Sequence, residues 1–127
     1  MLINESSGLN NNFITDLEFY DKKLYIATKS GLDILLIEEN FLLDSHNFIE
    51  INQSMIYDIN ISKDDLYLLL DSGMLHYDLK KEKILDYLNE RYFEVDIDNQ
   101  QNLILSTDKK IYKTNQNQIE YLTYINN

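Results

Sequence analysis

Short runs in which apolar and polar residues alternate fill most of this chain, and polar tips separate them. The first run is Ile14–Phe19, and a tip at Tyr20–Lys23 and a second run at Leu24–Thr28 follow it. A period of two residues places successive side chains on opposite faces of a β-strand. No segment sustains the period of about 3.6 residues that marks an amphipathic helix. The pattern therefore predicts an all-β chain.

The same pair of runs returns twice farther along the chain. The later repeats place the first run, the tip and the second run at 56–61, 62–65 and 66–70, and at 92–97, 98–102 and 103–107. The spacing of roughly 40 residues is typical of stacked or radial arrays of one structural unit. One such unit cannot bury both faces of its sheet, so neighbouring units must cover them.

Two further strands complete each repeat. Gly31 and Gly73 mark the turn after the second run, because glycine suits a positive φ, whereas Lys110 in the third repeat indicates a different turn. Third strands are expected at 32–37, 74–79 and 111–114, and fourth strands at 41–43, 84–88 and 119–124. Each repeat is then a four-stranded antiparallel meander, the unit of a β-propeller. We expect one all-β domain over 1–127, with blades at about 8–48, 52–89 and 91–124.

The first repeat also resembles a known family. The stretch GLNNNFITDLEFYDKKLYIATKSGL is similar to the two-component-regulator propeller repeat, with matches at Gly8, Leu9, Asn12, Ile14, Leu17, Leu24, Ile26, Thr28, Gly31 and Leu32. The family's usual Trp is replaced by Tyr25, Tyr67 and Ile104 in the three repeats. The resemblance covers about 8–124, and it implies blades of a multi-bladed sensor or scaffold domain. The motif carries no catalytic residues that transfer to this chain.

Two alternatives for the fold stay open. A β-trefoil also has three repeats and a similar length, and the length favours it because propellers have at least about four blades. The residue pattern favours the propeller. Three blades do not close a ring, so we expect completion by a homodimer or by missing blades, which either belong to the same protein, if this chain is a fragment, or come from another protein.

The charge of the chain narrows its partners. Twenty-two acidic residues against eleven basic ones give a formal net charge of −11, which disfavours nucleic acid and anionic membranes. The chain has no cysteine, which excludes disulfides and zinc–thiolate sites. The first residues lack the basic and apolar regions of a signal peptide, so a cytoplasmic protein is expected if Met1 is the native start.

Most candidate chemistry has a simpler structural interpretation. The run Asp44-Ser45-His46 has triad residue types, but neighbouring residues cannot converge as a triad does. His76 is expected to be a structural histidine within a strand. The stretch Glu94–Asn102 has alternating oxygen ligands but lacks the glycine and the glutamate of a calcium-binding loop. We expect no catalytic residue, no metal and no cofactor.

One polar feature recurs in all three repeats. An acid occupies the same place in each first strand, at Asp16, Asp58 and Glu94. The first strand of a blade lines the central channel of a propeller, so these acids are candidates for binding a cation or a basic group. The other interpretation is that they satisfy backbone donors where strand and loop meet.

The sequence therefore predicts a noncatalytic propeller module for binding or scaffolding, such as the sensor-type part of a signalling protein. The alternatives are an enzyme with its active site at the mouth of a completed propeller, and a β-trefoil that binds carbohydrate or protein. The expected partner is a second copy of the chain or a protein that supplies further blades.

Overall fold

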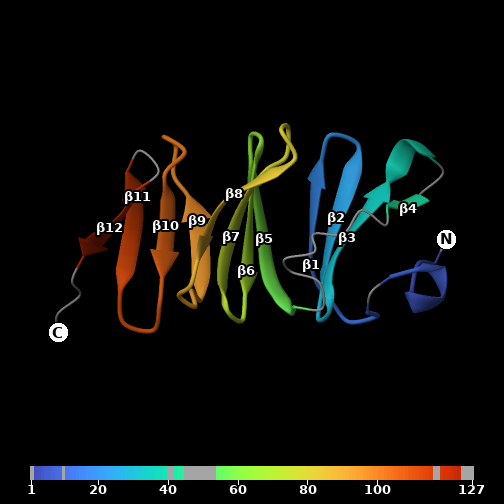
Figure 1. Ribbon diagram of the computed structural model, residues 1–127, viewed down its shortest axis with the longest axis horizontal. Coiled ribbons are helices and arrows are strands. Elements are labelled where there is room, and N and C mark those ends of the chain that lie inside the picture. Colours follow the sequence, from blue (N-terminus) through green and yellow to red (C-terminus); the bar gives the residue numbers. More distant parts are fainter. Residues whose placement is uncertain (1, 10, 40–41, 45–53, 116–117, 124–127) are drawn as a thin grey trace. The chain divides into compact units, whose positions relative to one another are not determined.

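The computed structural model describes residues 2–9, 11–39, 42–44, 54–115 and 118–123. Within these residues it forms three four-stranded antiparallel sheets and two short 3₁₀ turns, η1 (Glu5–Ser7) and η2 (Ile37–Glu39) (Figure 1). The predicted all-β class is thus confirmed. Each sheet is a meander in chain order, which is the arrangement of propeller-like blades, and the β-trefoil alternative is set aside.

The strands of the three sheets follow the three repeats. The first sheet contains β1 (Ile14–Tyr20), β2 (Lys23–Thr28), β3 (Gly31–Leu36) and β4 (Leu42–Asp44). The second contains β5 (Ile56–Ser62), β6 (Asp65–Leu70), β7 (Gly73–Asp78) and β8 (Lys83–Leu88). The third contains β9 (Glu94–Ile97), β10 (Leu103–Ser106), β11 (Ile111–Asn115) and β12 (Gln118–Thr123).

The chain divides into two compact units, Met1–Ile61 and Ser62–Asn127. The first unit holds the first sheet and nearly all of β5, and the second holds β6–β8 and the third sheet. Among the described residues, no helix has the length and apolar character needed to cross a bilayer.

In the first unit, the N-terminal segment folds back on the first sheet. The Asn12 backbone N–H donates to Glu5 Oε1 at 3.0 Å, and the Glu5 backbone N–H donates to Asn12 Oδ1 at 2.7 Å. This reciprocal pair closes a loop that carries Leu9 onto the sheet. Leu9 is buried in a cluster with Ile26 and Leu35, and the half-buried side chains of Ile3, Leu24 and Ile37 pack against that cluster. The Leu9 and Asn12 of the family motif thus have structural roles.

The β1–β2 tip shows how turn geometry fixes the register of a hairpin. Asp21 and Lys22 have φ of 46° and 65°, and two successive positive φ values are typical of a two-residue hairpin turn that matches the strand twist. The tip aligns Tyr20 with Lys23, so that Leu17 pairs with Ile26. The predicted tip therefore lies where the alternation placed it.

In the second unit, the turns between second and third strands differ as predicted. Gly73 has a positive φ and begins β7. In the third repeat, Thr107 makes the turn instead, because its backbone N–H donates to Lys110 O and its Oγ1 accepts the backbone N–H groups of Lys109 and Lys110. A side-chain oxygen there replaces the conformational freedom of glycine.

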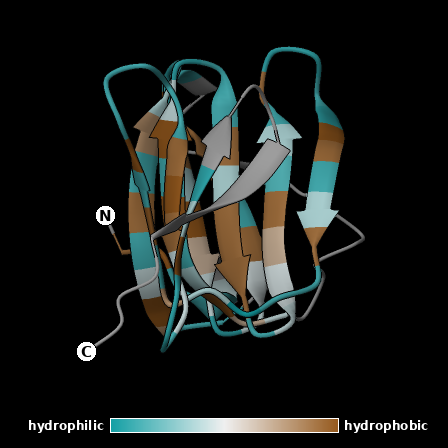
Figure 2. Cartoon of the chain, turned by 90° about the vertical axis from the view of Figure 1, so that its left-hand side faces the viewer, coloured by the Kyte–Doolittle hydropathy of each residue, from teal (hydrophilic) through white to brown (hydrophobic). Residues whose placement is uncertain are grey.

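The core of the second unit fills the space between two consecutive sheets. The buried cluster comprises Tyr67, Leu69, Met74, Tyr92, Val95, Leu103 and Leu105. Its members come from β6, β7, the third sheet and Tyr92 just before β9, so the sheets pack face to face as neighbouring blades do. Figure 2 shows apolar residues concentrated on strands, whereas the hairpin tips are hydrophilic.

The β9–β10 tip is closed by a single carboxylate. Asp98 Oδ1 accepts the backbone N–H groups of Gln100 at 2.8 Å and Asn102 at 2.9 Å. These two bonds, that of Asn102 first, hold the pKa of Asp98 below its ordinary value, and Lys113 at 3.7 Å adds to the effect. The stretch considered for calcium thus forms a hydrogen-bonded turn.

The lowered pKa of Asp98 predicts a pH-dependent stability. A carboxyl with a lower pKa in the folded state stabilises the fold above its unfolded pKa, and this stabilisation is lost as the pH falls through the folded value. The urea midpoint of the wild type should fall when the pH is lowered from neutral to below the ordinary aspartate pKa. We expect Asp98→Asn to show a smaller fall in this midpoint, because the asparagine does not titrate. Equal acid sensitivity in the variant and the wild type would contradict this assignment.

Candidate functional site

The recurring acid of the first repeat links two consecutive first strands within the first unit. Asp16 Oδ2 accepts the backbone N–H of Ile59 on β5 at 2.9 Å, and its Oδ1 accepts the backbone N–H of Leu17 at 2.8 Å. Beside it, Thr15 Oγ1 donates to the Ile56 carbonyl oxygen at 2.5 Å. Asp16 therefore satisfies backbone donors with both carboxylate oxygens and ties β1 to β5.

Removing this carboxylate should destabilise the fold. We expect Asp16→Ala to lower the free energy of unfolding by about 1–3 kcal/mol, because it leaves the backbone N–H of the buried residue Ile59 without its charged acceptor. Urea denaturation measures the effect. As a matched control, Asp108→Ala removes an exposed carboxylate and should change the free energy by less than about 0.5 kcal/mol. Equal effects of the two substitutions would contradict the linking role of Asp16.

The other two acids of the set have different surroundings. Asp58 is half-buried on β5 in the first unit, and its Oδ2 accepts a hydrogen bond from Asn60 Nδ2 at 2.9 Å. Glu94 is exposed on β9 in the second unit. The binding of a cation or basic group by Asp16, Asp58 and Glu94 therefore stays a prediction for each residue separately.

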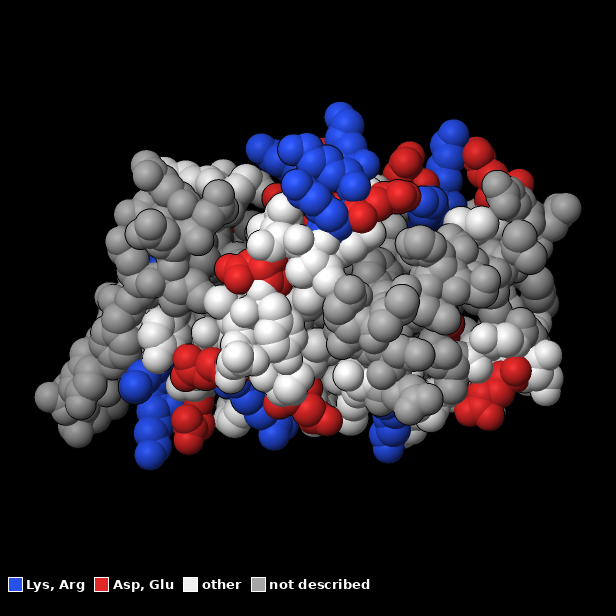
Figure 3. Space-filling view, viewed as in Figure 1, with Lys and Arg blue, Asp and Glu red and all other residues white. Residues whose placement is uncertain are grey.

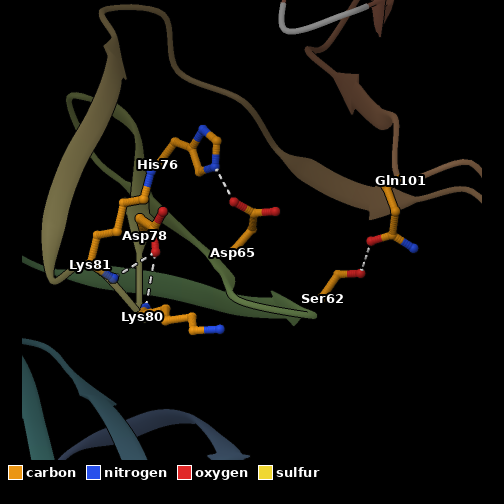
Figure 4. A network of polar contacts seen from close by, with 7 residues as sticks. All are labelled: Ser62, Asp65, His76, Asp78, Lys80, Lys81 and Gln101. Atoms are coloured by element: carbon orange, nitrogen blue, oxygen red, sulfur yellow. Dashed lines mark hydrogen bonds and ion pairs between the residues drawn. The ribbon is translucent and has the colours of Figure 1, made fainter.

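A polar pair that the sequence did not single out lies in the second unit. His76 Nε2 contacts Asp65 Oδ1 at 2.9 Å (Figure 4), and the imidazole stacks on the Tyr67 ring with centroids 4.4 Å apart. The β6–β7 pairing places Tyr67 opposite His76, so Asp65 is its diagonal neighbour on the same face. The sequence contains a signal for this pair, because the turn at Gly73 fixes the register of β6 and β7 and so places Asp65 near His76. His76 is thus an oriented, packed histidine, as expected from its place in a strand.

Burial and charge act on the groups beside this pair. Burial, followed by the negative charge of Asp65, raises the pKa of the Tyr67 hydroxyl well above its ordinary value. Tyr67 therefore stays protonated at physiological pH and contributes packing rather than charge.

Three further hydrogen bonds fix the neighbouring tips, as Figure 4 shows. Asp78 Oδ1 accepts the backbone N–H groups of Lys81 and Lys80, each at 2.9 Å, and these bonds, that of Lys81 first, lower the pKa of Asp78. Ser62 Oγ donates to Gln101 Oε1, which joins the β5–β6 tip to the β9–β10 tip within the second unit. Figure 3 shows most of the basic side chains (blue) at the upper and lower ends of the view, with acidic side chains (red) among them. These contacts are those of well-satisfied turns.

The remaining candidates do not assemble into a site. Of the run Asp44-Ser45-His46, the last two residues lie outside the described residues. In the described part of the chain, no three histidine, aspartate or glutamate side chains gather closely enough to hold a metal ion. The polar contacts described above therefore stabilise turns and hold strands together.

Known structures resemble this fold across most of the chain. The extracellular domain of the putative hybrid two-component system BT4673 from B. thetaiotaomicron matches with a TM-score of 0.72 and 15% identity, over 92% of this chain and 17% of that one. The corresponding domain of BT3049 matches with a TM-score of 0.67 and 17% identity, over 90% and 17%. PorZ, a surface component of the type-IX secretion system of Porphyromonas gingivalis, matches with a TM-score of 0.68 and 15% identity, over 95% and 18%.

These similarities concern the fold, because the identities are low. The chain spans less than a fifth of the length of each of these three structures. Neither a family model nor a curated protein matches the sequence. The resemblance to two-component-regulator propeller repeats is confirmed, since two of the three structures are extracellular domains of putative hybrid two-component systems.

One expectation from the sequence needs correction. A cytoplasmic location was expected because the N-terminal residues do not form a signal peptide. Both two-component structures are extracellular domains, which points away from the cytoplasm. The expectation failed because the first residues of a sequence say little about the compartment of a repeat module.

Proposed function

We propose that this chain is a noncatalytic, sensor-type segment of a β-propeller that binds its ligand outside the cytoplasm. The similarity of its blades to extracellular sensor domains of two-component systems supports this function. The contacts of the polar side chains agree with it. Asp16, Asp98 and His76 each have partners that hold strands or turns in place.

The ligand that we propose is a cation or a basic group, and the candidate residues, each considered separately, are Asp16, Asp58 and Glu94. Their recurrence on first strands and the net charge of −11 favour a positively charged ligand. Glu94 is exposed whereas Asp58 is half-buried, so a ligand can reach Glu94 more readily than Asp58. Completion of the propeller by a second copy or by another blade-bearing protein belongs to the same proposal.

Calorimetric titration tests the ligand class. Calcium ions and an oligolysine peptide are each titrated into the 127-residue chain and into the single variants Asp58→Asn and Glu94→Gln. We expect at least one probe to bind and either variant to weaken it by about tenfold, equal to about 1.4 kcal/mol. Moderate salt should be present, because it screens unspecific attraction to an acidic surface.

Matched variants separate a site from a general charge effect. Glu82→Gln and Asp108→Asn each remove one exposed carboxylate outside the recurring set. They should leave the affinity unchanged. Absence of binding by both probes, or equal weakening by all four variants, would overturn the proposed ligand class.

A further inference from the structure

The second unit shows how one sheet covers the first strand of the next. Val95 on β9 is 6% exposed and lies in one cluster with Tyr67, Leu69 and Met74 of β6 and β7. Ile97, two residues farther along β9, packs against that cluster. The face of a blade that presents the positions of Tyr67, Leu69 and Met74 is therefore the face that receives the following blade.

The equivalent places on β1 are exposed. The repeat aligns Leu17 with Val95 and Phe19 with Ile97, yet Leu17 is 49% exposed and Phe19 is 60% exposed. Both share a sheet face with Ile26 and Leu24, through the pairs Leu17–Ile26 and Phe19–Leu24. The N-terminal segment covers the Leu24 and Ile26 part of that face through Leu9 and leaves the two β1 side chains uncovered. Adjacent exposed apolar side chains of this size mark an association surface.

The third sheet carries the matching face. The repeat aligns Ile104, Ser106 and Ile111 with Tyr67, Leu69 and Met74. These three side chains are only half-buried, and they lie on the face opposite to Val95 and Leu105. The β9 part of this face carries the exposed acids Glu94 and Asp96, so apolar contact would come from β10 and β11.

The sizes of the side chains on the two faces are complementary. The exposed face of the first sheet has Phe19 where the third repeat has Ile97. This face is therefore bulkier than the β9 face that packs against β6 and β7 in the second unit. The third sheet has Ile104 and Ser106 where the second has Tyr67 and Leu69, so it is smaller. Large side chains facing small ones allow two layers to interdigitate at the density of a protein interior. In the first and second repeats, Tyr25 and Tyr67 occupy the position of Ile104, and both are already buried within the chain. The face of the third sheet that carries Ile104 is therefore the one available to a second copy.

We propose that Leu17 and Phe19 of one copy of the chain pack against Ile104, Ser106 and Ile111 of a second copy. This inference rests on the proposed function as a propeller module. It identifies the side chains through which one module would contact another. Each copy carries both faces, so two copies can form two identical head-to-tail contacts and associate as a dimer. Closed homodimers with twofold symmetry are the commonest oligomers.

Light scattering on the 127-residue chain tests the association. The wild type should have twice the mass of a monomer at micromolar concentration, and Leu17→Glu and Phe19→Glu should each abolish the dimer. Both residues are exposed within one chain, so the variants keep their fold, which circular dichroism verifies. Leu85→Glu, at a residue 44% exposed on β8, is the matched control and should leave the dimer intact. A wild-type monomer, or equal loss with Leu85→Glu, would overturn the proposal.

Cysteine cross-linking tests which faces meet, because the chain has no cysteine of its own. The double variant Leu17→Cys/Ile104→Cys should form a disulfide-linked dimer on mild oxidation, and each single variant should not. A dimer linked by Leu17→Cys alone would mean that two first sheets meet, which overturns the head-to-tail contact. No ligand is present in these experiments, so their result is independent of whether the proposed ligand binds.

Discussion

Replacing Gly73 by valine is expected to lower the free energy of unfolding by about 2–5 kcal/mol, from steric overlap together with backbone strain. A Cβ atom at this position would lie 1.9 Å from the Leu88 carbonyl oxygen and 3.0 Å from the Leu88 carbonyl carbon. Real Cβ contacts do not come so close, so β7 and β8 would have to separate where Met74 pairs with Leu88. The φ of +157° adds strain for a β-branched residue.

Urea denaturation followed by fluorescence or circular dichroism measures this loss. The control is Lys110→Ala in the third repeat, where Thr107 makes the turn through backbone groups that alanine retains. That substitution should cost less than about 0.5 kcal/mol. An unchanged midpoint for Gly73→Val would show that β7 and β8 do not approach as described.

Replacing Leu105 by alanine is the second large expected effect, a loss of about 2–5 kcal/mol. The Leu105 side chain is fully buried in the cluster between the second and third sheets, with Leu69 and Val95 among the members of that cluster. Truncation removes apolar surface and leaves a cavity that sheets held by backbone ladders cannot close. The denaturation midpoint should fall while the slope with urea stays unchanged.

Leu85→Ala provides the comparison for this experiment. Leu85 is the same residue type at 44% exposure on β8, so its truncation should cost well under 1 kcal/mol, within about the range of surface substitutions. A similar loss for Leu105→Ala and Leu85→Ala would mean that the two sheets are not packed through the cluster around Leu105.

Much of the fold follows from local patterns in the sequence. Alternation of apolar residues determines strands, because one face of each strand must be buried, and the tip residues determine hairpin register. The β1–β2 hairpin and the Gly73 turn were both expected on these grounds and are present. The absence of glycine at Lys110 also indicated a different turn, which Thr107 forms. These features depend on residues close in sequence, so a single repeat contains the information.

The pairing of groups distant in sequence depended on the tertiary structure. Alternation cannot show that Asp16 accepts the N–H of Ile59, because that bond arises only when the folded first unit brings β1 beside β5. The recurring acids looked alike in the sequence, yet Asp16 links two strands whereas Glu94 is exposed. The same limit applies to Leu17 and Val95, which occupy equivalent places in their repeats but differ in exposure. Burial is a property of what lies opposite a side chain, and only the folded chain specifies that neighbour.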